Sequence, residues 1–383
     1  MGHAHLVGVA NEIAHERVHV EEGAERLDEV RVAWRNWLRL PVKIIDEYNR
    51  IPTKTQSALL TMVAEGYVET YDQSLSTTGD TGIDSWFFTA NDDAGGGTFA
   101  VIQALRDRMD VTVAALGFNS RFLDELIARV ESDERPEEHV PPELVLSGQD
   151  RRDIAAAIRA VPVPDPVRRR IEFFVSHFEF VQHGGRRFEY RTKDTAATAG
   201  IDIGEIIERN SGADLEVDPG AQTVTSISVR AILVLITYAK AIAWFRGQAE
   251  VGVDDVGAVL PFVLRGKLLP NRRHPRFDGG SDQELGLDSV SWLADLWADS
   301  NRQFSALGRD SDDPVGALLV QFDAGIDHLD AVAVAGRITM VETEIRRIAD
   351  TGKLYGRDYD DLLALKYLHQ RYTNYRRWLD LAR

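Results

Sequence analysis

The sequence predicts a protein of the α/β class, with a parallel sheet near its N-terminal end and helices through most of the remainder. Two short apolar segments, "VKII" (42–45) and "SWFFTA" (85–90), are typical of buried strands. A helical pattern, "KTQSALLTMVAEG" (54–66), lies between them. Strand–helix–strand order favours a parallel sheet, and beyond residue 110 strand patterns become scarce.

Local signals define each predicted element. The β-branched residues of 42–45 favour a strand, and Gly66 is a typical stop for the helix over 54–66. The stretch 67–90 contains glycine in a turn and predicts a hairpin that leads into the second buried strand. Apolar residues at helical spacing predict a further helix over 26–40.

Three parts are expected along the chain. "PVPDP" (162–166) indicates a boundary, so we expect an α/β part at 1–160 and an all-α part at 161–280. A helical extension is expected at 281–383, where three amphipathic segments predict a helical hairpin or a small bundle.

Composition limits the class of protein. Hydrophobic residues make up 44% and charged residues 27% of the 383 residues, as in soluble globular proteins. No apolar run reaches the roughly 20 residues that span a bilayer, and no signal-peptide pattern is present, so we expect a cytoplasmic protein without a membrane partner. The absence of cysteine excludes disulfides and thiolate metal sites. No transition metal is expected to be bound by the ten histidines.

The net charge of −17 argues against general nucleic-acid binding, which relies on Lys and Arg to neutralise phosphates. One segment of the sequence, in contrast, would suit nucleic-acid binding. It is a basic and aromatic set near the C-terminus that could contact nucleic acid, made of Arg371, Tyr372, Tyr375, Arg376, Arg377 and Trp378. Helical spacing and balancing charges favour a packed helix with a solvated face, so nucleic acid is the least favoured partner.

Two adjacent acids, Asp46 and Glu47, follow the first buried strand. In P-loop NTPases an Asp at this position helps to hold Mg²⁺, and a following Glu can polarise the attacking water. An apolar tetrapeptide followed by Asp-Glu also occurs often by chance, so this motif alone is weak evidence.

The second strand ends near a polar residue, Asn91, in a position where ring ATPases orient the lytic water. The alternative is an asparagine that caps the following loop. Further along, Arg108 could stabilise the γ-phosphate of a neighbouring subunit, although an isolated Asp-Arg pair is more often a surface ion pair. Spacing favours Arg108, but Arg106 lies half a helical turn away.

The stretch 42–113 resembles AAA+ ATPases of the MoxR type. The segment "IIDEYNRIPTKTQSALL" (44–60) is similar to their Walker B region, and "TANDDAGGGTFAVIQALRDRMD" (89–110) is similar to their sensor 1 and arginine-finger region. The chain departs from the family pattern at Asp92, Gln103 and Met109. The matching positions are Asp46, Glu47, Asn49, Arg50, Lys54, Thr55, Gln56, Ala58, Leu59, Leu60, Asn91, Gly97, Thr98, Ala104, Asp107 and Arg108.

The stretch 226–268 resembles the small helical lid of the same family. The resemblance places Arg230 in the position of sensor 2, which contacts the bound phosphates. Without the resemblance, Arg230 would be interpreted as a surface arginine on an amphipathic helix. Apolar side chains of this helix are expected to face a core, namely those of Ile232, Leu233, Leu235, Ile236, Ala239, Ile242 and Ala243.

No phosphate-binding G-x-x-x-x-G-K-[ST] motif occurs in the 383 residues. The chain is therefore expected to be either a truncated product or a divergent relative that does not hydrolyse ATP, and the retained catalytic residue types favour truncation. Since the P-loop supplies most contacts to the β- and γ-phosphates, we expect this chain to bind ATP weakly and to hydrolyse it slowly or not at all.

The resemblance implies an ATPase that uses ATP and Mg²⁺ and remodels a protein client within a homo-oligomeric ring, such as a hexamer. It assigns Asp46 to the metal, Asp46, Glu47, Asn91 and Arg230 to the nucleotide, and Glu47, Asn91, Arg108 and Arg230 to catalysis. It also implies partners with a von Willebrand A domain. The alternative is a scaffold that keeps the AAA+ fold without hydrolysis. The client and the ring size are not encoded in recognisable motifs.

Overall fold

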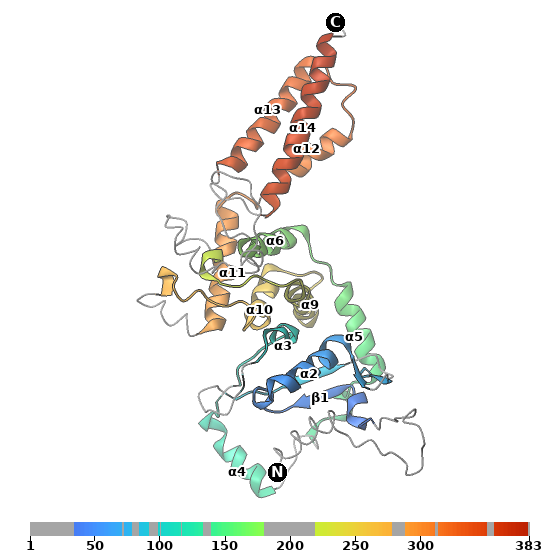
Figure 1. Ribbon diagram of the computed structural model, residues 1–383, viewed down its shortest axis with the longest axis vertical. Helices are drawn as coiled ribbons and strands as arrows, with labels where there is room; N and C mark the ends of the chain where they lie inside the picture. Colours follow the sequence, from blue (N-terminus) through green and yellow to red (C-terminus); the bar gives the residue numbers. More distant parts are fainter. Residues whose placement is uncertain are drawn as a thin grey trace, which may run out of the picture. The chain divides into compact units, whose positions relative to one another are not determined.

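A computed structural model describes residues 34–70, 73–78, 84–91, 99, 101–115, 117–132, 139–179, 219–277, 288–310, 313–350 and 356–381. The chain divides into two compact units (Figure 1). The α/β unit comprises residues 1–110 and 120–152, and the helical unit comprises 111–119 and 153–383. Within the described residues, no helix is both long and apolar enough to cross a membrane.

The α/β unit contains the predicted pair of parallel strands. β1 (Val42–Ile45) pairs with β4 (Ser85–Phe88) in parallel register, so that Ile45 lies opposite Phe88. β2 (Tyr67–Thr70) and β3 (Gln73–Ser76) form the expected antiparallel hairpin. The predicted strands are therefore confirmed, and the parallel pair brings the ends of β1 and β4 to one edge.

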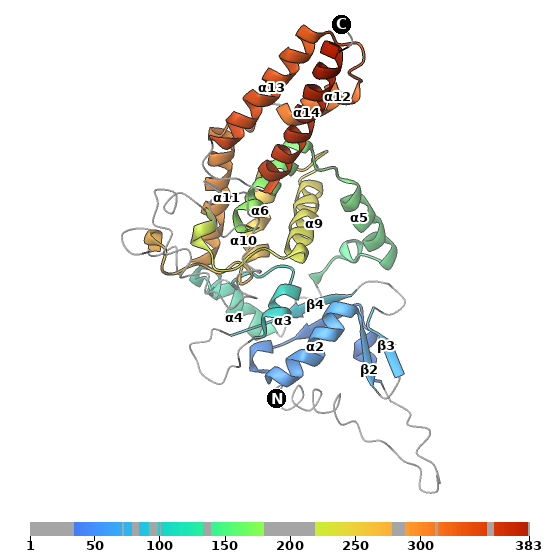
Figure 2. The ribbon, with the colours of Figure 1, turned by 45° about the horizontal axis from the view of Figure 1, so that its top comes forward.

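Among its described residues, the α/β unit contains the whole of the α-helices α2 (Thr53–Glu65), α3 (Gln103–Arg108) and α4 (Leu123–Ser132) (Figure 2). α2 ends where predicted, because Gly66 adopts the left-handed conformation (φ 69°) and donates its N–H to the Met62 carbonyl. Its apolar side packs against the strands in a small core formed by Leu38, Ile45, Leu59, Met62 and Leu75. Most of the predicted helix over 26–40 lies outside the described residues, and its end forms a short 3₁₀ turn at Asn36–Arg39.

A buried lysine joins β1 to the other strands of this unit. The Lys43 ammonium donates to the carbonyls of Leu40 (2.7 Å) and Thr77 (2.8 Å) and pairs with Asp84 (2.5 Å). It also lies 4.9 Å from the centre of the Trp86 ring, a cation–π distance. These contacts satisfy the charge of a side chain that is only 2% exposed, so this strand position tolerates a lysine.

The helical unit is built on α6 (Asp165–Glu179), α9 (Val229–Phe245), α10 (Val253–Leu264) and α11 (Ser289–Ala306), which enclose one large apolar core. α9 buries one residue per turn, namely Ala231, Leu235, Ala239 and Ala243. Its N-cap is Ser228, whose hydroxyl accepts the Ala231 N–H, and Arg246 beyond its end pairs with Asp255 of α10 (2.6 Å). α5 (Gly148–Ala160) spans the junction of the two units along the chain.

The C-terminal helices of this unit have a core of their own. α12 (Pro314–Asp323), α13 (Ala331–Ala349) and α14 (Gly356–Leu381) pack around Val334, Val341, Leu365, Leu368 and Tyr372, and α13 and α14 run side by side in both ribbon views (Figures 1 and 2). α13 and α14 thus form a helical hairpin, one of the two arrangements expected for 281–383, although α11 was expected to belong to it. α11, which lies beyond the expected boundary at 280, contributes Trp292, Leu293 and Leu296 to the core of α9 and α10.

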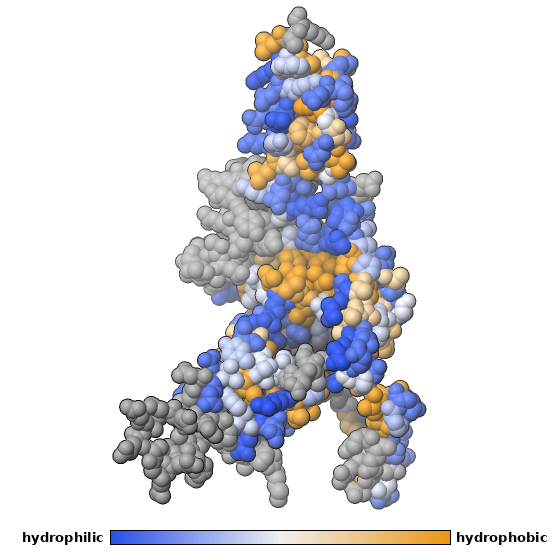
Figure 3. Space-filling view, turned by 90° about the vertical axis from the view of Figure 1, so that its right-hand side faces the viewer, coloured by the Kyte–Doolittle hydropathy of each residue, from blue (hydrophilic) through white to orange (hydrophobic). Residues whose placement is uncertain are grey.

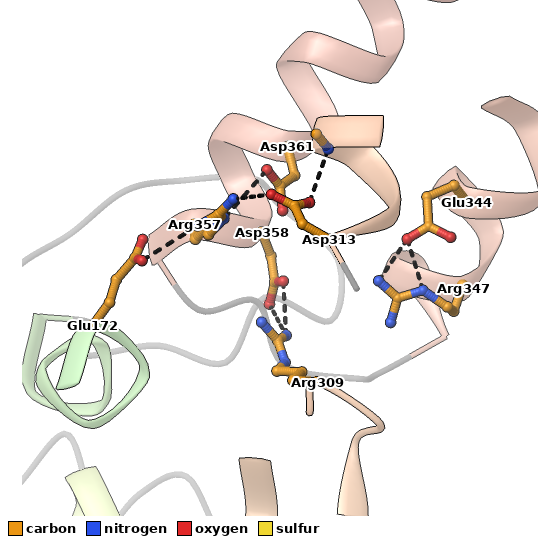
Figure 4. A network of polar contacts seen from close by, with 9 residues as sticks. Glu172, Arg309, Asp313, Glu344, Arg347, Arg357, Asp358 and Asp361 are labelled. Carbon is orange, nitrogen blue, oxygen red and sulfur yellow. Dashed lines mark hydrogen bonds and ion pairs between the residues drawn. The ribbon is translucent and has the colours of Figure 1, made fainter. Parts of the chain in front are cut away.

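Charged residues join α14 to α6 and to the N-cap residue of α12 (Figure 4). Arg309 donates two hydrogen bonds of 2.7 Å to the buried carboxylate of Asp358. Arg357 pairs with Glu172 of α6 (3.5 Å) and also with Asp313. A further Arg–carboxylate pair, Arg347 and Glu344, lies within α13.

Candidate functional site

The candidate site lies at the edge where β1 and β4 end. The first residues after β1 are Asp46 and Glu47, and the first after β4 is Thr89. Main-chain hydrogen bonds extend the parallel pairing past the strands, from the Thr89 N–H to the Ile45 carbonyl (3.0 Å) and from the Tyr48 N–H to the Thr89 carbonyl (2.9 Å). The two loops are thus fixed to each other by backbone contacts.

The Thr89 hydroxyl connects the two acidic positions. It donates to Asp46 Oδ1 and accepts the backbone N–H of Glu47 (2.9 Å). The residue Asp46 as a whole is exposed to solvent. Thr89 belongs to the segment singled out in the sequence, but no pattern there predicted that its hydroxyl would join both acids.

Glu47 and Asn91 contact each other directly. The Asn91 side-chain amide donates to Glu47 Oε1, and the Arg50 Nε lies 3.6 Å from Glu47 Oε2. Asp46, Glu47 and Asn91, which the resemblance assigned to one site, are therefore close together.

Glu47 has an unusual backbone conformation, with φ 52° and ψ 46°. Among the described residues it is the only non-glycine with positive φ. A side chain in this region costs about 1–2 kcal/mol, and such strain often occurs at functional sites. The strained backbone turns the chain directly after β1 into the short 3₁₀ helix at Tyr48–Arg50.

Two buried amides hold the surrounding loops. The Asn49 side chain donates to the Asn91 carbonyl (2.9 Å), and the Asn49 carbonyl accepts the Phe99 N–H (2.7 Å). Gln56 of α2 donates to the Ile51 carbonyl (2.9 Å) and accepts the N–H of Ile102 (3.1 Å), which precedes α3. In the sequence these residues stood out only as matches to the family pattern, and their contacts give them a structural role.

Arg106 and Arg108 both lie in the last turn of α3, and both are half-buried. The packing of α3 therefore does not indicate which of the two arginines would reach a neighbouring subunit. Arg230 lies in the helical unit, where it occupies the first turn of α9 and is half-buried. Gly97, Thr98 and Asp92 lie outside the described residues.

The arrangement suits a hydrated divalent cation that is shared with phosphate oxygens. Mg²⁺ is commonly held by one or two protein carboxylates together with water and substrate phosphates. The exposed carboxylate of Asp46, oriented by Thr89, fits that role. Among the described residues, no group of three or more His, Cys, Asp or Glu side chains could bind a metal ion without such help.

Two tyrosines of the basic and aromatic set near the C-terminus pack within the C-terminal helices, whereas Arg371, Arg376, Arg377 and Trp378 are exposed. Tyr372 is 1% exposed in the core of the C-terminal helices, and the Tyr375 hydroxyl donates to the Asp327 carbonyl (3.1 Å). Tyr375 also stacks on Trp378. The contacts of the two tyrosines match the packed-helix interpretation, and the exclusion of nucleic acid stays a prediction.

Comparison with known proteins adds evidence for the helical unit. Residues 221–286 match the AAA lid domain. This segment contains α9 and α10, the two helices for which a lid was expected. With the parallel strands of the α/β unit, the match supports an AAA+ ATPase, and the fold is an α/β AAA+ core followed by an all-α lid.

The other comparisons are less informative. No curated protein matches this sequence. Among solved structures, the chain is similar to a candidate ATPase from Cytophaga hutchinsonii, with 20% identity and a TM-score of 0.48. The similarity covers 67% of this chain and 66% of that protein. A similarity at this level carries no argument about activity.

Proposed function

We propose that the protein is a MoxR-type AAA+ ATPase subunit that binds ATP and Mg²⁺ and remodels a protein client in a ring assembly. The observation that carries the proposal is the hydrogen-bonded group of Asp46, Glu47, Thr89 and Asn91 at the ends of two parallel strands. The AAA lid match in the same chain supports it independently.

Each residue of the group has a defined task in this proposal. Asp46, held by Thr89, contacts the hydration shell of Mg²⁺, which when bound neutralises phosphate charge. Glu47 accepts a hydrogen bond from the attacking water and orients it. Asn91 fixes the Glu47 carboxylate through its amide, so that the water meets an oriented acceptor.

Residues outside this group complete the proposed reaction. Arg108, with Arg106 as the alternative, contributes positive charge to the nucleotide of a neighbouring subunit, and Arg230 of the lid contacts the phosphates. A partner with a von Willebrand A domain is part of the same proposal, on the basis of the family resemblance alone.

The proposal is tested by binding of the fluorescent analogue MANT-ATP to the full chain, with and without Mg²⁺. We expect weak binding that depends on Mg²⁺ and is weakened about tenfold by Asp46→Asn, because one charge-assisted contact is lost. Glu47→Gln should retain binding and lower any turnover. Glu65→Gln, which neutralises an exposed acid at the end of α2, is the matched control.

Equal Mg²⁺-dependent binding by Asp46→Asn and the unaltered chain would contradict the role of Asp46. No detectable nucleotide binding by any variant would favour the alternative, a non-hydrolysing scaffold with an AAA+ fold. Turnover that survives Glu47→Gln unchanged would overturn the role of Glu47.

A further inference from the structure

A cavity of about 920 Å³ lies within the helical unit, at the upper end of the range typical of small-molecule sites. Its lining residues come from the end of α5, from α6 and α9, and from the first turn of α14. None of these residues belongs to the group around Asp46. The cavity is therefore distinct from the candidate nucleotide site.

Most of the wall is apolar. Ile171 and Val175 of α6 are 6% and 9% exposed, so this side of the cavity is part of the packed core. Ile232 and Ile236 of α9 line the opposite side and are half-buried. Figure 3 shows a patch of hydrophobic residues at the height that α9 occupies in Figure 1, next to a band of hydrophilic residues.

Charged side chains around the cavity are predominantly cationic. Four bases, Arg159, Arg168, Lys240 and Arg357, accompany two acids, Glu172 and Asp360. This local excess of positive charge occurs in a chain whose net charge is −17. An anion would be attracted to this cavity more strongly than to the surface as a whole.

Two of the four bases are already engaged by carboxylates. Arg357 pairs with Glu172 (3.5 Å), and Arg168 pairs with Asp165 (3.2 Å). Lys240 instead donates to the backbone carbonyl of Arg159 (3.0 Å).

The remaining two bases have capacity for an added anion. Within the described part of the chain, neither Arg159 nor Lys240 has a carboxylate at ion-pair distance. The contact between Lys240 and the Arg159 carbonyl holds the two residues side by side. Lys240 lies one turn beyond Ile236 on α9, so its ammonium is next to the apolar wall.

We propose that this cavity binds a small amphiphilic monoanion, a molecule with one carboxylate and an unbranched apolar body. The carboxylate pairs with Lys240 and Arg159, and the apolar body lies against Ile232, Ile236 and Val175. A second carboxylate on the ligand would face Glu172 or Asp360, so a monoanion is preferred over a dianion. This inference goes beyond ATP-dependent remodelling and does not depend on it.

The proposal is tested with decanoate as the probe and the full chain, by isothermal titration calorimetry. We expect saturable binding at one site. 1-Decanol has the same chain length and no charge, and it should bind about tenfold more weakly because it lacks the charge-assisted contact. Lys240→Glu should weaken decanoate binding about tenfold or more for the same reason.

Two further variants separate the cavity from general surface effects. Ala160→Trp places a large side chain at an exposed position in the lining and should weaken both probes. Lys366→Glu reverses a charge at an exposed position of α14 away from the lining and should leave both unchanged. Circular dichroism and thermal unfolding of each variant establish that the fold is retained.

Three outcomes would overturn the proposal. The first is the absence of saturable decanoate binding. The second is equal affinity for decanoate and 1-decanol, because the cations would then have no part in binding. The third is an equal loss of affinity in Lys240→Glu and Lys366→Glu, which would attribute the effect to net charge rather than to the cavity.

Discussion

Glu47 has both a strained backbone and a carboxylate at the proposed reaction centre. Glycine would adopt the left-handed conformation of this residue at less cost. Glutamate is therefore not the residue type that best suits the backbone here. The side chain is instead held against Asn91. A residue that retains strain in order to place a carboxylate is consistent with selection for chemistry rather than for stability.

We expect Glu47→Gly to be more stable than Glu47→Ala by about 1 kcal/mol. Both variants lose the carboxylate, but the left-handed conformation is strained only in alanine, which has a Cβ atom. Urea denaturation of the two variants measures the difference directly. Equal stability, or a more stable alanine variant, would show that the backbone at this position relaxes and stores no strain.

At the scale of residues, sequence patterns predicted which residues belong to the candidate site better than they predicted the contacts between them. They singled out Asp46, Glu47 and Asn91, which the structure brings together. They did not predict the role of Thr89, because hydrogen bonds between residues more than 40 positions apart have no local signature.

The predicted core face of α9 was wrong in one respect. Leu233 is 62% exposed, whereas Ala231 is 1% exposed. Large apolar residues dominated the pattern, but alanine occupies three of the four positions that α9 buries, which allows close packing at this interface.

The helical elements of the second unit are joined by charges as well as by apolar contacts. Asp361 of α14 lies among Arg357, Arg309, Asp313 and Asp358 (Figure 4). Burial, together with the negative charges of Asp313 and Asp358, raises the pKa of Asp361 from 3.8 to about 6, and the nearby arginines oppose this shift. The protonated form is thus favoured in the folded state.

The raised pKa of Asp361 determines how the stability of the folded chain changes with pH. Because the folded state binds this proton more tightly than the unfolded state, Asp361 contributes stability below about pH 4 that is lost as the pH rises through about 6. At pH 7.5 the ionised carboxylate should therefore reduce the free energy of unfolding.

We expect Asp361→Asn to stabilise the chain at pH 7.5 by about 1 kcal/mol, a value reduced from the full shift because the carboxyl is partly solvated, and to have a smaller effect at pH 4.5. Urea denaturation at both pH values measures this. Asp360→Asn changes an exposed neighbour and is the matched control. Destabilisation by Asp361→Asn at pH 7.5 would show that its pairing with Arg357 outweighs the cost of burial.

At the scale of elements, the sequence predicted the parallel pair, the hairpin, the helix of 53–65 and the lid helices closely. These have strong local signals, such as β-branched runs, a glycine at the helix end and a serine at the start of α9. The domain boundaries expected at residues 160 and 280 remain predictions. α11 illustrates the difficulty, because it packs against α6 and α10 rather than with the C-terminal helices, and the apolar pattern alone does not identify its partners.

For the whole molecule, net charge is the property that most restricts partners. A charge of −17 disfavours contact with nucleic acid, and of the basic and aromatic side chains near the C-terminus Tyr372 is buried in the helical core and Tyr375 packs against it. Association between copies of the chain must also overcome this charge, so a ring would be stabilised by salt through screening.

We therefore expect no retention of single-stranded DNA or RNA by the full chain in filter-binding measurements between low and physiological salt. Arg376→Glu with Arg377→Glu should give the same result, since those side chains are not expected to contact phosphates. Tight binding that declines steeply with salt and is lost in the double variant would contradict this expectation and favour a nucleic-acid function for the C-terminal helices.

The enclosure of Lys43 has a chemical consequence. Acylation of a lysine requires a neutral, accessible amine, and this ammonium is held between two carbonyls, the Asp84 carboxylate and the Trp86 ring. Regulatory acetylation at Lys43 is therefore excluded as long as β1 and β4 stay paired. An acetyl group at this position would identify a molecule whose strands had separated or had not yet formed.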